Sequence, residues 1–261
     1  MPVAPPPFLS ADHVRRALEE AGCVAAEEEA AELLAAAGDD GRQLEELLAR
    51  RCTGEPLAWV VGHVRFCERR VLVHRGVYVP RPQSETLARA ALEALPEGGV
   101  AVDLCTGSGA LAVVLARGRP SAQVVGTEID PVAAACARVN GVVVFECDMA
   151  AGLPGELAGS TDVVTGVVPY VPTGAIGFLP RDAVDHEPRR ALDGGPEGTD
   201  QLVRAAVAAA MLLRSGGTLF LELGGDQADL LAPVLAAQGF APATVLLDDD
   251  GDVRGLHTRR R

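Results

Sequence analysis

A glycine-rich turn near the middle of the chain carries the residues best suited to bind a ligand. An apolar run at 100–104 contains Asp103 and leads through Cys105 into Thr106-Gly107-Ser108-Gly109 and an alanine-rich segment. Glycines let a ligand approach the backbone closely, and the N-terminus of a following helix offers N–H groups that lack partners. The pattern predicts a nucleotide-binding loop, and the alternative is a plain, tight strand-to-helix turn.

Two acidic residues stand at the expected ends of the next two strands. Glu128 lies nineteen positions after Gly109, a spacing at which a carboxylate can hold the hydroxyls of a ribose. Asp148, in FECDM, ends the following apolar run, where a carboxylate can accept a hydrogen bond from an adenine amino group. Together with the loop, these two residues favour a nucleotide-binding site over a plain turn.

A second segment, VVTGVVPYVP, extends from Val163 to Pro172, about sixty residues after the loop. Its apolar run ends in Pro169-Tyr170, and by itself it is typical of a buried strand that ends in a turn. The side chains of Val167 and Val168 neither donate nor accept hydrogen bonds. Polar contacts at this point would therefore come mainly from backbone carbonyls.

Short apolar runs alternate with alanine-rich segments from residue 100 onward, which is the pattern of a parallel sheet flanked by helices. We expect strands at 100–104, 123–128, 142–147, 162–168, 217–223, 243–247 and 253–258. We expect helices at 110–117, 132–140, 200–213 and 227–238. The glycine- and proline-rich stretch 172–199 is too long for a passive connection and is expected to cover a site. The predicted fold class is α/β, Rossmann-like, with a mostly parallel sheet.

Three regions are expected along the chain. Residues 1–53 predict a small helical domain, in which Ser10 is a good N-cap and Gly38 a good C-terminal stop. Residues 54–79, which include LAWVVGHVRF, change to strand-like composition and predict a β-hairpin linker. Residues 80–261 would form the Rossmann-like domain.

The charge and cysteine content exclude several classes of protein. A net charge of −13 argues against a broad nucleic-acid surface, because such surfaces need clustered cations. The six cysteines are scattered without a C-x-x-C pair, so we expect reduced thiols and neither a disulfide framework nor a metal site. The first residues have neither a basic nor an apolar targeting region, and no membrane-length apolar stretch follows. These features predict a soluble, cytoplasmic protein.

The run D-L-x-T-G-S-G resembles the first motif of class I S-adenosylmethionine-dependent methyltransferases. That resemblance implies that Asp103 lies near the methionine end of the cofactor, with Glu128 on the ribose, Asp148 on the adenine and Met149 packed on the base. It implies a cofactor site made of the following residues: Asp103, Cys105, Thr106, Gly107, Ser108, Gly109, Glu128, Asp148, Met149 and Val167.

Longer segments resemble one family, the protein-(glutamine-N5) methyltransferases that modify peptide chain release factors. The resemblance rests on GEPLAWVVGHVRFCERRVLVHRGVYVPRPQSE, on HEPRRALDGGPEGTDQL and on LELGGDQ, and it extends from about residue 50 to the end. It implies a small N-terminal helical domain, a linker hairpin and a release-factor glutamine as methyl acceptor. Arg81 and Glu85 would lie at the joint between the domains, either paired with each other or beside the substrate.

Two positions depart from the family pattern. Cys105 replaces the usual first glycine of the loop, and Val167-Val168 replaces the Asn-Pro of an Asn-Pro-Pro-Tyr motif that leaves Pro169 and Tyr170 in place. In the family, the Asn side chain and a backbone carbonyl accept hydrogen bonds from the target NH2. The acceptor loop is thus expected to act through its backbone carbonyls and through Tyr170.

Three hypotheses for the function remain open. The chain methylates a release-factor glutamine or another protein amide, or it is repurposed for a small molecule of specialised metabolism, or it binds the cofactor without catalysis. DNA adenine methylation ranks below these, because the acidic chain offers no clear basic groove.

Overall fold

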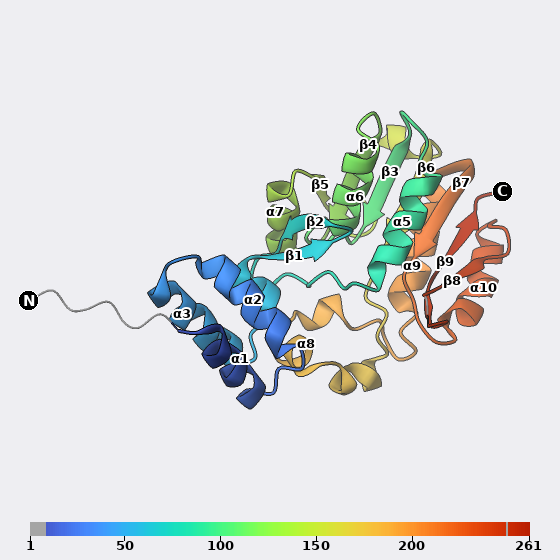
Figure 1. Ribbon diagram of the computed structural model, residues 1–261. Coiled ribbons are helices and arrows are strands. Elements are labelled where there is room, and N and C mark those ends of the chain that lie inside the picture. Colours follow the sequence, from blue (N-terminus) through green and yellow to red (C-terminus); the bar gives the residue numbers. More distant parts are fainter. Residues whose placement is uncertain (1–8, 249) are drawn as a thin grey trace, which may run out of the picture.

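A helical bundle forms the N-terminal part of the chain in a computed structural model that describes residues 9–248 and 250–261 (Figure 1). Its helices are α1 (Ala11–Glu20), α2 (Ala26–Ala37) and α3 (Gly41–Cys52). Ser10 caps α1, and Asp40 caps α3 by accepting from two backbone N–H groups at 3.0 Å. Buried leucines on all three helices form their common core. Gly38 follows the last residue of α2, as expected of a C-terminal stop.

The linker holds a short helix and a hairpin, β1 (His63–Phe66) and β2 (Arg69–Leu72). The hairpin turns at Cys67-Glu68, where both residues have positive φ, as a two-residue turn requires. The strand prediction for LAWVV was wrong, because residues Leu57–Val61 form α4, which ends at Gly62 with φ +82°. A short apolar run has no period that separates a buried strand from a buried helix.

Seven strands form the central sheet, in the order β5-β4-β3-β6-β7-β9-β8. Their bounds are β3 (Val100–Leu104), β4 (Gln123–Glu128), β5 (Val143–Glu146), β6 (Thr161–Gly166), β7 (Leu213–Leu221), β8 (Thr244–Leu247) and β9 (Val253–Arg259). The strands from β3 to β7 pair in parallel, whereas β9 pairs antiparallel with both β7 and β8. All seven predicted strands are present, and the mostly parallel α/β sheet is confirmed.

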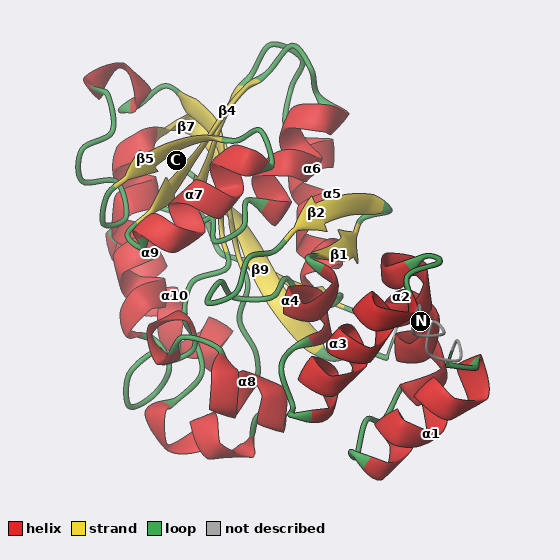
Figure 2. Cartoon of the chain, turned by 90° about the vertical axis from the view of Figure 1, so that its left-hand side faces the viewer, coloured by secondary structure: helices red, strands yellow, loops and turns green. Residues whose placement is uncertain are grey.

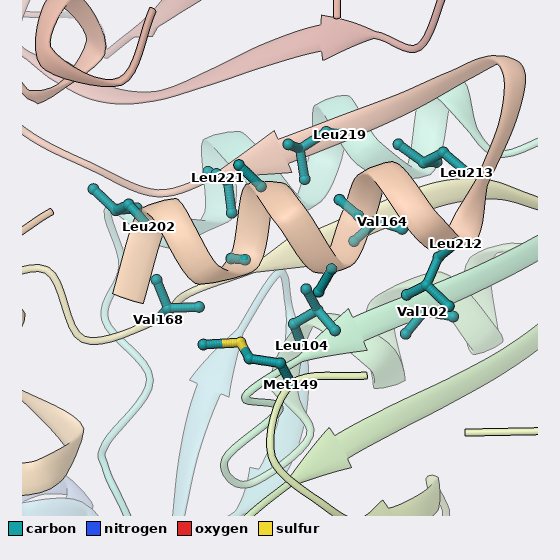
Figure 3. Packing of buried hydrophobic residues seen from close by; sticks show 14 of the residues in the cluster. Val102, Leu104, Met149, Val164, Val168, Leu202, Leu212, Leu213, Leu219 and Leu221 are labelled. Carbon is teal, nitrogen blue, oxygen red and sulfur yellow. The ribbon is translucent and has the colours of Figure 1, made fainter. Parts of the chain in front are cut away.

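Helices cover both faces of this sheet. The helices α5 (Ser84–Ala94), α6 (Ala110–Gly118) and α7 (Pro131–Val139) pack on one face, and α9 (Asp200–Leu212) and α10 (Gln227–Ala237) pack on the other. Figure 3 shows Leu202 and Leu212 of α9 in one buried cluster with strand residues such as Val164 and Leu219. Each such fully buried side chain contributes about 1.5–3 kcal/mol. The sequence analysis did not predict α5.

The order of the strands places two loops side by side. Strand β4 lies beside β3, and β5 lies beside β4. The next strand in the sequence, β6, pairs with the opposite edge of β3. Leu104 and Gly166 are paired at the ends of β3 and β6, so the residues that follow them leave the sheet together. Ligands of open α/β sheets bind at such a switch point, outside the carboxyl ends of the strands.

The stretch between β6 and α9 contains short helices rather than plain loop. These are η2 (Thr173–Phe178), α8 (Arg181–His186) and η3 (Arg189–Ala191), and a further turn, η1 (Gly155–Leu157), precedes β6. Figures 1 and 2 place α8 between the N-terminal bundle and the sheet domain. Within the part of the chain that the structure describes, no helix is long and apolar enough to cross a membrane.

Candidate active site

Asp103 lies beneath the glycine-rich loop and holds it to the neighbouring strand. Its two carboxylate oxygens accept hydrogen bonds from the hydroxyls of Thr106 and Thr165, each at 2.6 Å. The residue is 2% exposed, and this burial raises the pKa of Asp103 to about 6. The Asp103 side chain does not line the adjacent cavity, so its visible role is to shape the loop.

Glu128 ends β4 and faces the same loop. Its carboxylate oxygens accept from the backbone N–H groups of Gly107 and Asp130, each at 2.9 Å. Burial raises the pKa of Glu128 above the ordinary value of a glutamate. Each carboxylate oxygen can accept a second hydrogen bond, so both remain available to the hydroxyls of a ribose.

A cavity of about 290 Å³ opens over the loop. Its lining includes these residues of the predicted cofactor site: Cys105, Thr106, Gly107, Ser108, Glu128, Asp148, Met149 and Val167. The buried Ser108 hydroxyl has no hydrogen-bond partner, and Gly107, at φ +59°, has open space where a side chain would be. S-adenosylmethionine fits this lining. It can form hydrogen bonds with the Ser108 hydroxyl, lie against the Gly107 backbone and place its ribose hydroxyls at the Glu128 carboxylate.

Gly109 has a packing role instead. It does not line the cavity, and an added Cβ would lie 2.8 Å from a Val142 methyl group and 3.1 Å from the Cβ of Ala137. Gly109 therefore lets the start of α6 lie close to α7. Its φ of +85° is a second reason for glycine at this position.

Asp148 and Met149 close one end of the cavity. Asp148 forms an ion pair with Arg204 of α9, and both side chains are partly exposed at the cavity rim. Met149 has φ +50° and lies 4.0 Å, sulfur to sulfur, from Cys105, whose φ is +53°. Figure 3 shows the Met149 side chain among the residues of the central core. Met149 thus both lines the cavity and anchors its floor.

The acceptor loop, Val167 to Tyr170, separates this cavity from a second one of about 320 Å³. Val167, Tyr78 and Ala191 line both cavities, and Pro169 lines the first and Tyr170 the second. Val168 is 1% exposed and packs into the core (Figure 3). The two cavities thus adjoin at Val167, Tyr78 and Ala191.

The stretch 172–199 supplies much of the second cavity. Leu179, Pro180 and Ala183 line it, together with Ala191 and Leu192. This agrees with the expectation that so long a segment covers a site. The lining is mostly apolar, and its polar members are Tyr78, Arg81, Gln83 and Tyr170.

Arg81 forms an ion pair with Glu187, not with Glu85. The Glu187 side chain is fully buried, and the Arg81 guanidinium carbon also lies 5.0 Å from the centre of the Tyr78 ring. Glu85 instead accepts from the backbone N–H of Cys67 at 2.9 Å and pairs with Arg89. The Arg81–Glu85 alternative was therefore wrong, because the first turn of α5 places Glu85 against the hairpin turn.

Several residues of the site were not predicted individually. Tyr78 belongs to the linker, and Glu222 and Gln227 belong to the segment LELGGDQ. Glu222 accepts from the Tyr170 hydroxyl at 3.0 Å, and the Gln227 side chain donates to the Tyr170 carbonyl at 2.7 Å. All three lie inside segments that carry the family resemblance, which was the available signal.

The sheet order and the loop over β3 define a class I S-adenosylmethionine-dependent methyltransferase. Two solved structures share the fold. The Thermus thermophilus 16S rRNA N2 G1207 methyltransferase in complex with AdoMet and guanosine has a TM-score of 0.52 and 18% identity, covering 76% of this chain and 44% of that one. The ribosomal protein L11 methylase of Lactobacillus delbrueckii has a TM-score of 0.50 and 15% identity, covering 69% and 81%.

Sequence relatives identify the family. A release factor glutamine methyltransferase of Geobacter sulfurreducens is 35% identical over 211 residues, which are 78% of this chain and 73% of the relative. A 4-amino-L-phenylalanine/4-methylamino-L-phenylalanine methyltransferase of Streptomyces pristinaespiralis is 36% identical over 201 residues, 73% of this chain and 68% of that one. No protein-family model matches the chain. The chain belongs to the protein-(glutamine-N5) methyltransferase family, and it is an S-adenosylmethionine-dependent methyltransferase.

Proposed function

We propose that this enzyme methylates the amino nitrogen of a small acceptor with a flat, apolar body, such as an aromatic amine. The observation that carries the proposal is the position of Val167. This apolar side chain stands in the wall common to the two cavities, where the glutamine-modifying enzymes that the chain resembles have an Asn. The acceptor nitrogen would therefore meet valine and backbone carbonyls at the point of transfer.

The first cavity is proposed to hold the cofactor through the loop residues and Glu128. S-adenosylmethionine, when bound, supplies an electrophilic methyl group on its sulfonium sulfur. Glu128 and the backbone of the loop would hold the ribose and the amino-acid end, and Asp148 would lie near the adenine. Asp103 keeps the loop in shape through Thr106 and Thr165.

An amine needs less help from the protein than an amide does. The lone pair of a glutamine nitrogen is delocalised into its carbonyl, so holding both N–H bonds orients the nitrogen and stabilises its developing positive charge. Loss of one such preorganised partner typically lowers the rate by about 10²–10³-fold. A buried N–H without an acceptor adds about 1–3 kcal/mol against binding. The lone pair of an aromatic amine is delocalised into its ring less than that of an amide into its carbonyl, so such an acceptor avoids part of the first penalty.

The Streptomyces pristinaespiralis relative supports this acceptor class, because its name states that it acts on 4-amino- and 4-methylamino-L-phenylalanine. A cavity of about 320 Å³ with an apolar lining suits a ring of that size. Cytoplasmic location remains part of the proposal. All six cysteines, which lie in the described part of the chain, are free thiols, as expected in a reducing compartment.

A release-factor glutamine is the second candidate acceptor. Several relatives carry that activity in their names, among them the Geobacter sulfurreducens protein and one of Neisseria gonorrhoeae that is 35% identical. The N-terminal bundle and Tyr170 of the motif are also present. In this case a backbone carbonyl would have to replace the missing Asn side chain.

Labelled S-adenosylmethionine, incubated with either 4-amino-L-phenylalanine or a release factor, separates the two candidates. We expect label on the amino acid and at least 100-fold less on the release factor. Val167→Asn should raise glutamine methylation and lower amine methylation. Val171→Asn is the matched control, because Val171 lines only the second cavity. Label on the release factor alone with the natural chain would show that the proposed acceptor is wrong.

A further inference from the structure

Glu222 is a buried carboxylate directly behind the acceptor cavity. It follows the last residue of β7, is 1% exposed, and does not itself line the cavity. One carboxylate oxygen accepts a 3.0 Å hydrogen bond from the hydroxyl of Tyr170, whose side chain does line the cavity. The other oxygen, Oε2, is buried and has no hydrogen-bond partner within the part of the chain that the structure describes. Glu222 thus reaches the cavity through Tyr170.

The two arginines that face Glu222 are each paired with another carboxylate. Arg81 approaches from the linker but is paired with Glu187. Arg254 approaches from β9 but is paired with Asp248 and Asp252. Tyr78 from the linker and the buried Ser84 hydroxyl of α5, which faces the Glu222 carboxylate, complete the surroundings.

Burial governs the titration of both members of the pair. It raises the pKa of Glu222 above the ordinary glutamate value, although the Ser84 and Tyr170 hydroxyls oppose the shift. It also raises the pKa of Tyr170, and the Glu222 charge adds to that effect. A carboxylate that binds a proton more tightly than usual is suited to accept one near neutral pH.

We propose that Tyr170 and Glu222 form a relay that takes the proton released by the methylated acceptor nitrogen. The inference rests on the proposed function only in needing a nitrogen acceptor, amine or amide. When the methyl group moves, its bond to the sulfonium sulfur breaks with the electron pair staying on sulfur, and the new C–N bond forms. The nitrogen then carries a positive charge and one proton more than the neutral product. Its N–H bond breaks with the electron pair staying on nitrogen, an O–H bond forms at the Tyr170 oxygen, and the original Tyr170 proton moves to Glu222 Oε1.

Tyr170 is the member that touches the acceptor, and Glu222 acts through it. Net charge is conserved in this step, because the Glu222 carboxylate becomes a carboxylic acid while the positively charged nitrogen becomes neutral. The Glu222 carboxylate also places a buried negative charge behind Tyr170 while the positive charge on the nitrogen develops. A purely structural Glu222 would hold the Tyr170 ring but would not change the pH dependence of transfer.

The kinetic test measures kcat as a function of pH. The acceptor is 4-amino-L-phenylalanine or a release factor, whichever of the two the natural chain methylates. The rate should fall at low pH as Glu222 becomes protonated, with the midpoint above the ordinary range of a glutamate. Glu222→Gln and Tyr170→Phe should each lower kcat by about 10²-fold and remove that acid limb. Glu222→Asp should restore part of the rate together with the limb. Glu93→Gln, an exposed change on α5, is the control for general effects.

A second measurement does not depend on the acceptor. The chain has two tyrosines, so a Tyr78→Phe background leaves Tyr170 as the only one, and the carbon NMR shift of its Cζ atom can be followed as the pH rises from acid to neutral. That shift should change as Glu222 titrates; Glu222→Gln should remove the change, whereas Glu93→Gln should keep it. In this background, cofactor affinity measured by calorimetry should be the same with and without Glu222→Gln.

The outcomes distinguish the two proposals. Methylation of the release factor alone overturns the proposed acceptor but leaves the relay to be decided by its pH profile. An unchanged acid limb in Glu222→Gln, or a pH-dependent Tyr170 Cζ shift that survives that change, overturns the relay. If neither probe is methylated, the NMR titration alone decides whether the two groups are coupled.

Discussion

The side-chain amide of Gln227 donates a 2.7 Å hydrogen bond to the backbone carbonyl of Tyr170. The same nitrogen lies 3.2 Å from the carbonyl of Gly198 and 3.3 Å from that of Glu197, and the Gln227 oxygen accepts from the N–H of Gly224. Gln227 is 5% exposed. One side chain at the start of α10 therefore ties the acceptor loop to the segment that covers it.

Gln227→Glu should damage transfer more than cofactor binding. The change removes the donor and places a carboxylate against three carbonyl oxygens, and each unsatisfied buried group costs about 1–3 kcal/mol. We expect a lower thermal midpoint and at least a tenfold lower kcat, with an unchanged cofactor Kd by calorimetry. Gln238→Glu, at the other end of α10, is the matched control. Equal losses in both variants would mean that the Gln227 contact has no special role.

Arg81→Met tests the buried ion pair with Glu187. Removing one partner leaves a fully buried carboxylate uncompensated, which typically costs about 3–5 kcal/mol. We expect a value near the lower end, because the Arg81 side chain is 25% exposed. The double variant Arg81→Met/Glu187→Leu should recover most of the loss in urea unfolding. Glu85→Gln, at the more exposed pair with Arg89, should cost less than about 1 kcal/mol.

Much of the sheet domain could be predicted because its strands and helices differ in hydrophobic period. Glu128 and Asp148 could likewise be placed at strand ends by spacing alone. In contrast, α4 was missed because a five-residue apolar run has no period that separates a helix from a strand. Helix α5 was missed although its sequence carries a signal, since Leu87, Ala88 and Ala91 recur at helical spacing.

Contacts between distant segments could not be predicted in the same way. Tyr170 and Glu222 are 52 residues apart, and they meet because β6 pairs with β7 in one register. The backbone N–H of Glu222 donates to the carbonyl of Gly166 at 3.0 Å, which fixes that register at the site. Arg81 and Glu187, separated by 106 residues, depend similarly on the tertiary packing of the covering segment.

Asp103→Asn should change the pH dependence of stability. The folded pKa of Asp103 is about 6, above its model-peptide value of 3.8, so between these values the folded state binds the proton more tightly than the unfolded state. The contribution of this group is therefore favourable at low pH and is lost as pH rises from about 4 to about 6. An Asn keeps partners for Thr106 and Thr165 but does not titrate.

The measurement for Asp103 compares urea unfolding of the natural chain and the variant at several pH values. Relative to the variant, the natural chain should lose about 2–3 kcal/mol between pH 4 and pH 7, since each pKa unit corresponds to about 1.4 kcal/mol. Other buried acids, such as Glu128, titrate in both proteins and cancel in the difference. A constant difference across this range would show that Asp103 stays ionised in the folded chain.

Cys105→Gly should stabilise the protein without harming cofactor binding. Cys105 has φ +53°, a left-handed conformation in which non-glycine residues are strained by about 1–3 kcal/mol. Glycine relieves this strain, although it adds entropy to the unfolded chain and loses the contact with Met149 at 4.0 Å. We expect a net gain of up to about 1 kcal/mol in the free energy of unfolding. Cys105→Val should lose at least as much, because a β-branched side chain fits this backbone worst. A loss of stability in the glycine variant would show that the sulfur packing outweighs the backbone strain.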